Sequence, residues 1–85
     1  MKIVKINSIA CPSCIIMNNR FEELKKKYSF SSEEIDYDFD DYDYEVGKTL
    51  PVFIFLDKDN NELSRLVGEV SLKKFEEEIK KYIEG

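Results

Sequence analysis

The first 28 residues change from an alternating pattern to a helical one, and this switch restricts the fold more than any other feature. Ile3, Val4 and Ile6 stand among polar residues in the segment 2–7, which predicts a short, largely buried strand. From about Pro12 to Tyr28 apolar side chains recur at helical spacing and polar side chains take much of the other side. The start of the chain therefore predicts a strand followed directly by an amphipathic helix.

The segment after this helix predicts a turn and a second strand. Residues 31–34 are expected to form the turn. Ile35, Tyr37 and Phe39 then alternate with aspartates, which predicts a strand with one solvated face. The acidic run 33–45 lacks the glycine and the ligand spacing of an EF-hand, so we interpret it as solvated surface and not as a calcium site.

The second half of the chain predicts a hairpin and a closing helix. Pro51 opens a strand over 52–56, residues 57–61 form a turn, and a fourth strand returns over 62–67. Ser71 can cap the final helix. The helix residues expected to face the core are Leu72, Phe75, Ile79, Tyr82 and Ile83. Between residues 41 and 50 we expect at most one helical turn.

These elements predict one α/β domain over residues 1–85, in the order β-α-β, a connection, then β-β-α. The expected architecture is a four-stranded mixed sheet with helices on its faces. Because a strand–helix–strand crossover is right-handed, the first two strands should be parallel. If the third strand runs antiparallel beside the first, Pro51 lies next to Cys11 at the carboxyl end of the first strand. The aromatics expected in the core are Tyr37, Phe39, Phe53 and Phe55.

Charge and hydropathy exclude two classes of partner. The net charge of −5 argues against a nucleic-acid partner, because it offers no excess of cations to neutralise phosphates. No apolar run approaches the roughly 20 residues that span a bilayer, and residues 1–6 alternate instead of forming a signal-peptide core. We therefore expect a cytoplasmic monomer that binds neither nucleic acid nor membrane.

Cys11 and Cys14 carry the chemistry that the sequence predicts. Two cysteines this close are too few for a secreted disulfide framework, and without any histidine they cannot complete a four-ligand zinc site. Redox chemistry is the favoured interpretation, and no bound cofactor or metal is expected. Two alternatives stay open: ordinary buried cysteines, or half of a metal site shared between two chains.

The Cys-Pro-Ser-Cys segment falls where the helix begins. A thiolate is the attacking species in disulfide exchange, and unpaired N–H groups at a helix amino terminus favour negative charge there. Pro12 suits the first helical position, where its missing N–H costs nothing. We predict that Cys11 is the nucleophile and that Cys14, one turn on, resolves the mixed disulfide.

Pro51 has two possible roles. A proline is tolerated at the start of a strand for steric reasons alone. Alternatively it is a cis proline whose preceding residue, Leu50, presents its backbone to an extended substrate. The residues by themselves do not decide between these roles.

Three motifs together resemble the thioredoxin superfamily, and the likeness covers nearly the whole chain. They are Cys11-Pro12-Ser13-Cys14 after the first strand, the run from Thr49 to Phe55 at the proline strand, and Val67-Gly68 before the last helix. The resemblance implies a thioredoxin-like minimal core and a cis Pro51. The second helix, between Phe39 and Pro51, is expected to be shortened, which is a departure from the family. It also implies that Cys11 attacks, that Cys14 resolves, and that Pro12, Ser13, Leu50 and Pro51 contact the substrate.

The subfamily resemblance is mixed. Chain length and the Cys-Pro-x-Cys motif resemble glutaredoxin, whereas residues 65–71 resemble thioredoxin and lack the glutaredoxin Gly-Gly pair. Ala10 replaces the tryptophan of thioredoxins. No carboxylate occurs in residues 1–10, so the buried acid that assists the resolving cysteine is missing, and Lys5 or Asn7 falls near its place.

The expected function is therefore reduction of disulfides in protein substrates by a Cys11–Cys14 dithiol. The resemblance implies a flavin-dependent disulfide reductase as the electron donor. A glutathione-dependent glutaredoxin is the closest alternative. A redox-sensing or metal-binding interaction module without turnover is the alternative from another class.

Overall fold

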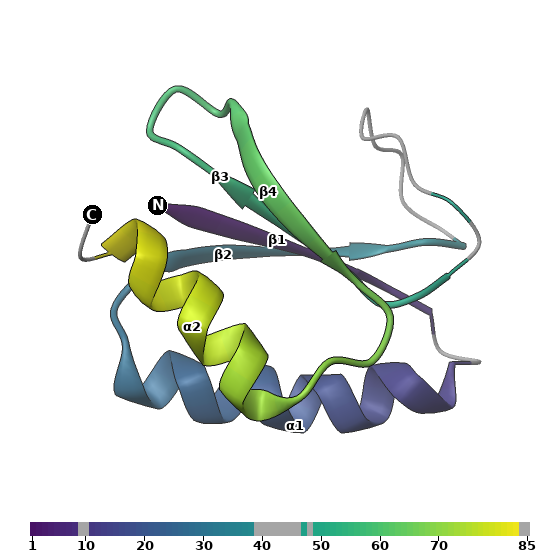
Figure 1. Cartoon of the computed structure of the whole chain (residues 1–85). Coiled ribbons are helices and arrows are strands. Elements are labelled where there is room, and N and C mark those ends of the chain that lie inside the picture. Colours follow the sequence, from purple (N-terminus) through teal and green to yellow (C-terminus); the bar gives the residue numbers. More distant parts are fainter. Residues whose placement is uncertain (9–10, 39–46, 48, 84–85) are drawn as a thin grey trace.

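A computed structural model of the chain describes residues 1–8, 11–38, 47 and 49–83 (Figure 1). The elements are β1 (Lys2–Asn7), α1 (Pro12–Lys27), β2 (Ser31–Asp36), β3 (Val52–Leu56), β4 (Glu62–Val67) and α2 (Leu72–Ile83). The predicted bounds of β1, β3 and β4 are confirmed residue for residue. The first helix ends at Lys27, and Tyr28 caps it through its N–H to the carbonyl of Leu24 at 2.9 Å.

The four strands form one mixed sheet in the order β2-β1-β3-β4. β1 is parallel to β2, and β3 is antiparallel to both of its neighbours. Ile6 near the end of β1 faces Val52 at the start of β3. The residue before Val52 is Pro51, so the register places it at the carboxyl end of β1, where α1 begins, as the sequence predicted.

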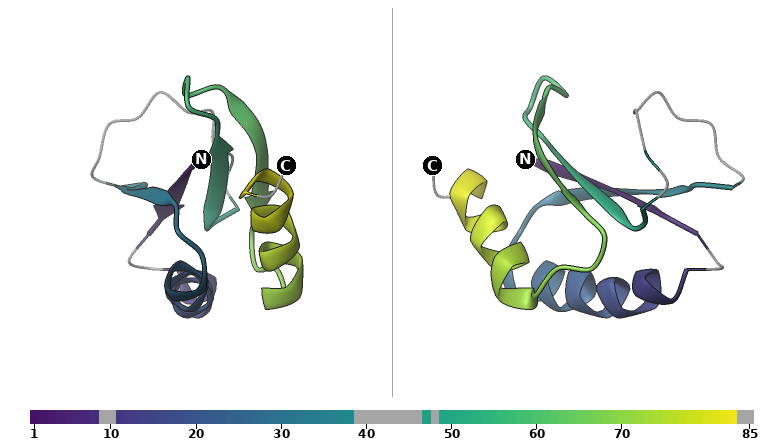
Figure 2. Two further views of the ribbon diagram at one scale, coloured as in Figure 1. Left: turned by 90° about the vertical axis from the view of Figure 1, so that its left-hand side faces the viewer. Right: turned by 45° about the vertical axis from the view of Figure 1, so that its right-hand side comes forward.

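Both described helices pack on the same face of the sheet (Figure 2). The sequence had predicted helices on its faces without assigning each helix to a face. Their interface with the sheet holds the main core, which is Ile3, Met17, Phe21, Leu24, Phe53, Phe55, Leu66, Phe75 and Ile79. The opposite face carries a second buried cluster of Val4, Ile6, Ile35, Val52, Ile54 and Leu56, against which Tyr37 and Leu50 pack. β3 is central in the sheet, and all five of its residues are buried.

The predicted turn at residues 31–34 was wrong, because these residues form most of β2. Apolar alternation could not reveal this strand, since Ile35 is its only buried residue and its other side chains are largely exposed. Backbone pairing with β1 makes the strand, and Lys2 adds an ion pair to Glu33 at 3.1 Å. The strand ends at Asp36, whose carboxylate accepts the N–H of Asp38 at 2.9 Å.

Two predictions about the segment between β2 and β3 are covered only in part by the described residues. Tyr37 follows β2 and is partly buried, whereas Phe39 and the shortened second helix lie outside the described residues. Ile83 was predicted to face the core but is 39% exposed, since it lies in the last turn of α2 and borders an open pocket. The predicted cap is confirmed, since the Ser71 hydroxyl accepts the N–H of Lys74 at 3.1 Å.

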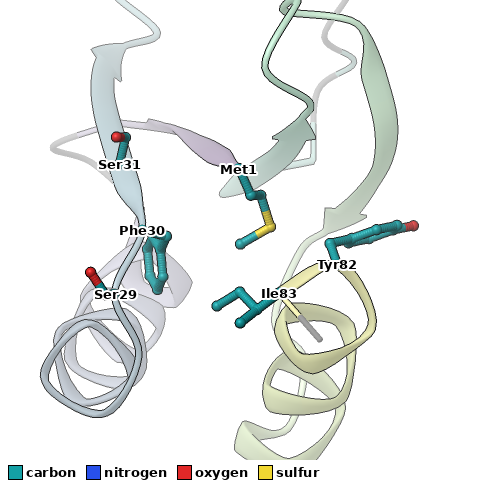
Figure 3. Close-up of a pocket in the computed structure, with 6 residues that line it drawn as sticks. All are labelled: Met1, Ser29, Phe30, Ser31, Tyr82 and Ile83. Carbon is teal, nitrogen blue, oxygen red and sulfur yellow. The ribbon is translucent and has the colours of Figure 1, made fainter. Parts of the chain in front are cut away.

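Ile83 borders a cavity of about 490 Å³ where the carboxyl ends of both helices approach the start of β1 (Figure 3). Its lining residues are Met1, Ser29, Phe30, Ser31, Tyr82 and Ile83. Met1, Phe30 and Ile83 point toward one another across the gap (Figure 3). This cavity is at the opposite end of α1 from the two cysteines, and none of its lining side chains is a carboxylate, an amine, a guanidinium or a thiol.

Candidate active site

Cys11 is the N-cap of α1, as the sequence predicted. Its backbone is extended, with φ −106° and ψ 109°, and Pro12 takes the first helical position behind it. The N–H of Cys11 donates to the carbonyl of Ser8 at 3.2 Å, which links the start of α1 to the residue that follows β1. Pro12 is exposed, whereas Cys11 and Ser13 are half-buried.

The sulfur of Cys11 is hydrogen-bonded to backbone groups of two described residues. It accepts the N–H of Cys14 at 3.3 Å, in the position that a serine or aspartate oxygen takes at other N-caps. As a thiol it also donates to the carbonyl oxygen of Leu50, at a distance of 3.6 Å. The sulfur of Cys11 therefore lies at the start of α1 with a backbone N–H directed at it, and it also reaches the segment before β3.

Cys14 is buried, with 2% of its surface exposed. Both cysteines are free thiols, and they lie one helical turn apart. Burial, and next the hydrogen bond with Cys11, raise the pKa of Cys14 to about 11. The thiol of Cys14 is therefore protonated at neutral pH, and it lies next to the accessible sulfur of Cys11.

The third part of the site is the Leu50–Pro51 peptide, which is cis, as the resemblance implied. The carbonyl of Pro51 accepts the N–H of Gly68 at 2.8 Å. Gly68 has φ +78°, and an added Cβ would lie 3.2 Å from Cγ2 of Thr49. The end of β4 thus holds the segment before β3 beside Cys11.

Comparison with known proteins decides the fold. No protein-family model matches the sequence, and no curated protein matches it either. Among solved structures, thioredoxin 1 from the thermophilic eubacterium Thermosipho africanus superposes with a TM-score of 0.76 at 24% identity, covering 99% of this chain and 96% of that one. The chain has the thioredoxin fold. A second match is the reduced thioredoxin of Schistosoma mansoni, with a TM-score of 0.71 at 24% identity, covering 94% of this chain and 76% of that one.

Within this thioredoxin fold the structure brings the predicted site residues together. Hydrogen bonds join Cys11 to both Cys14 and Leu50, and Pro12 and Pro51 flank these contacts in sequence. In the described part of the chain, no three His, Cys, Asp or Glu side chains are grouped to hold a metal ion. The same part contains no helix that is long and apolar enough to cross a membrane.

Sequence reasoning missed two exposed apolar residues beside the cysteines. Ile15 is 64% exposed and Ile16 is 42% exposed in the first turns of α1. Two β-branched apolar residues in a row directly after Cys14 were the available signal, because only one side of a helix can face the core.

Sequence reasoning also missed a polar pocket behind the buried thiol. This pocket of about 220 Å³ is lined by Asn7, Ser8, Cys14, Ile15, Asn18, Glu34 and Asp36. The Asn7 amide donates to Asn18 at 3.5 Å and to Glu34 at 3.4 Å, which links β1 with α1 and with β2. No periodicity could have found the pocket, since it joins three separate segments.

Proposed function

We propose that this chain is a thiol–disulfide oxidoreductase that reduces disulfides in protein substrates with the Cys11–Cys14 pair. The observation that carries the proposal is the asymmetry of the two thiols. Cys11 is accessible and accepts an N–H at the start of a helix, whereas Cys14 is buried and protonated one turn away. A nucleophile and a resolving thiol need this difference.

The proposed reaction consists of two successive thiol–disulfide exchanges. The Cys11 thiolate attacks one sulfur of a substrate disulfide, which forms a mixed disulfide and releases the first substrate thiolate. Cys14 then loses its proton and attacks the sulfur of Cys11, which closes the Cys11–Cys14 disulfide and releases the second substrate thiolate. Both substrate sulfurs are reduced, and the chain's two thiols are oxidised by the same two electrons.

The surroundings of Cys11 favour a polypeptide substrate. The carbonyl of Leu50 is already engaged with the Cys11 thiol, and an extended chain could pair with this backbone once a substrate sulfur takes the place of that proton. Pro12 and the exposed Ile15 and Ile16 add apolar surface at the same rim. Ser13 and Pro51 complete the proposed contact surface.

The proposed cycle needs an electron donor and no bound cofactor. A flavin-dependent disulfide reductase would return the pair to the dithiol, and glutathione is the alternative donor. The cytoplasm is the proposed compartment, because a reducing pool keeps such a pair available for reduction. The monomeric state stays a prediction.

The first test is the reduction potential of the Cys11–Cys14 couple, measured by equilibration in defined thiol–disulfide buffers and counting of alkylated thiols. A reversible two-electron couple at the reducing end, roughly −230 to −270 mV, supports the proposed reductase. Turnover of a disulfide-bonded test protein with added dithiol should accompany it. Turnover that depends on glutathione would favour the glutaredoxin alternative, and a reversible couple without any turnover would favour a redox sensor.

A further inference from the structure

Lys5 is the one charged residue that the fold buries within the described ranges. It lies in β1 on the helix-covered face, where Ile3 also points into the main core. Only 6% of its side chain is exposed, and its Nζ lies 5.3 Å from the ring centroid of Phe21 in α1. An ammonium group is thus held under the helix that carries both cysteines.

The ionic partner of Lys5 does not explain this burial. Nζ lies 3.6 Å from Oε2 of Glu34, and the side chain of Glu34 is 65% exposed. Withdrawing an ammonium from water costs far more than an ion pair with a largely solvated carboxylate returns. Lys2 shows the ordinary arrangement on the same strand pair, because it reaches Glu33 at 3.1 Å and keeps 35% of its side chain exposed.

The Lys5–Glu34 pair is connected to Cys14 through the polar pocket. Glu34 and Cys14 both line it, together with Asn7 and Asn18, whose amides are hydrogen-bonded to each other. The charged and titratable groups that line this pocket or contact Lys5, Phe21 or Cys14 are Lys5 from β1, Glu34 and Asp36 from β2, Lys25 from α1 and Cys11 at its N-cap. Lys25 contacts the same Phe21 ring, at 5.7 Å, and its side chain is 38% exposed.

We propose that Lys5 is a positioning residue whose buried ammonium stabilises the Cys14 thiolate when Cys14 attacks the mixed disulfide, while the polar pocket conducts the Cys14 proton to water. This inference rests on the proposed function. The direction of the electrostatic effect agrees with it, since the charge of Lys5 lowers the pKa of Cys14 while burial and Cys11 raise it. The assisted step forms the Cys14–Cys11 bond, breaks the Cys11–substrate bond and releases the substrate sulfur as a thiolate.

The decisive measurement is the pKa of Cys14 in a Cys11→Ser background, followed by the chemical shift of its ¹³C-labelled Cβ across a pH series. Lys5→Met keeps the buried methylenes and removes the charge, so the pKa of Cys14 should rise. Each unit of rise lowers the thiolate fraction at neutral pH about tenfold. Release from a preformed mixed disulfide is measured separately, in the chain that keeps Cys11. Because a more basic thiolate is also more nucleophilic, this release should slow by only about threefold for each unit by which the pKa of Cys14 rises.

Glu34→Gln is the second variant, and its expected effect has the opposite sign. It removes a negative charge from the pocket that Cys14 also lines and leaves Lys5 unneutralised, so the pKa of Cys14 should fall and release should accelerate. Glu34 is an exposed side chain, so this variant is expected to fold even if Lys5→Met does not. Lys2→Met is the matched control, since it breaks a neighbouring β1–β2 ion pair outside the pocket and should leave Cys14 unchanged.

An unchanged pKa of Cys14 in folded Lys5→Met overturns the inference, and so does an equal change in Lys2→Met. Neither result affects the proposed reductase activity, which is measured on the chain with both cysteines. Conversely, a wild-type chain that reduces no disulfide would contradict the proposed function, and the titration of Cys14 would still decide the role of Lys5.

Discussion

The sulfur of Cys11 lies 3.6 Å from the carbonyl oxygen of Leu50, although 39 positions separate the two residues. The pairing of Ile6 with Val52 produces this contact, because it aligns the end of β1 with the start of β3. The hydrogen bond from Gly68 to Pro51 holds the β3 end in place. A substrate sulfur bound to Cys11 would therefore lie directly beside the backbone of Leu50.

The two cysteines should respond differently to replacement by serine. Cys11→Ser should abolish disulfide exchange, because a hydroxyl at the accessible position does not attack a disulfide. Cys14→Ser should keep the first exchange and accumulate mixed disulfides, which mass spectrometry under non-reducing conditions detects. Multiple turnover by Cys14→Ser without a free thiol in solution would contradict the resolving role of Cys14.

The release step should depend steeply on pH, because the pKa of Cys14 is raised to about 11. Below that value the thiol is protonated, so the thiolate fraction and the release rate should rise about tenfold per pH unit. The measurement is stopped-flow release from a preformed Cys11 mixed disulfide, in which Cys11 no longer titrates. A rate that stays flat between neutral pH and pH 9 would show that Cys14 is not the group that must ionise.

Gly68→Ala should destabilise the fold by about 1–2 kcal/mol, since a side chain at positive φ is strained. Its φ is +78°, and the added Cβ would meet Thr49 at 3.2 Å. Thr49→Ser in the same chain should recover only the contact part of the loss. Gly47→Ala is the control, because a Cβ there has no neighbour within 4 Å. Urea unfolding measures all three variants, and equal losses at the two glycines would refute the argument.

Phe75→Ala should be among the most destabilising single changes in α2. Phe75 is fully buried, and its ring centroid lies 4.7 Å from Phe53, 5.9 Å from Phe21 and 6.1 Å from Phe55. Such a truncation costs about 3–5 kcal/mol, a large share of the roughly 5–15 kcal/mol that stabilises a domain. Ile83→Ala, in the exposed last turn, should cost far less by the same urea titration. Similar losses for both variants would mean that α2 does not pack as described.

Much of the fold was predictable because its signals are local. Alternation defined β1, and a continuous apolar run after Pro51 defined β3. β2 was misplaced because it is an edge strand of mostly exposed polar residues, whose formation depends on the backbone of β1. Ile83 was misassigned because helical spacing identifies a side of the helix but does not show that its last turn borders an open pocket.

The sequence by itself determined the Cys-Pro-Ser-Cys helix start, because a proline at the first helical position and a capping cysteine act within one turn. Only the tertiary structure decided what surrounds each thiol. The contact of Cys11 with Leu50 requires the order of β1 and β3, and the burial of Lys5 requires α1 packed over β1. Periodicity shows which side chains share a face, whereas the dielectric and the charges that a thiol experiences depend on the segments packed against it.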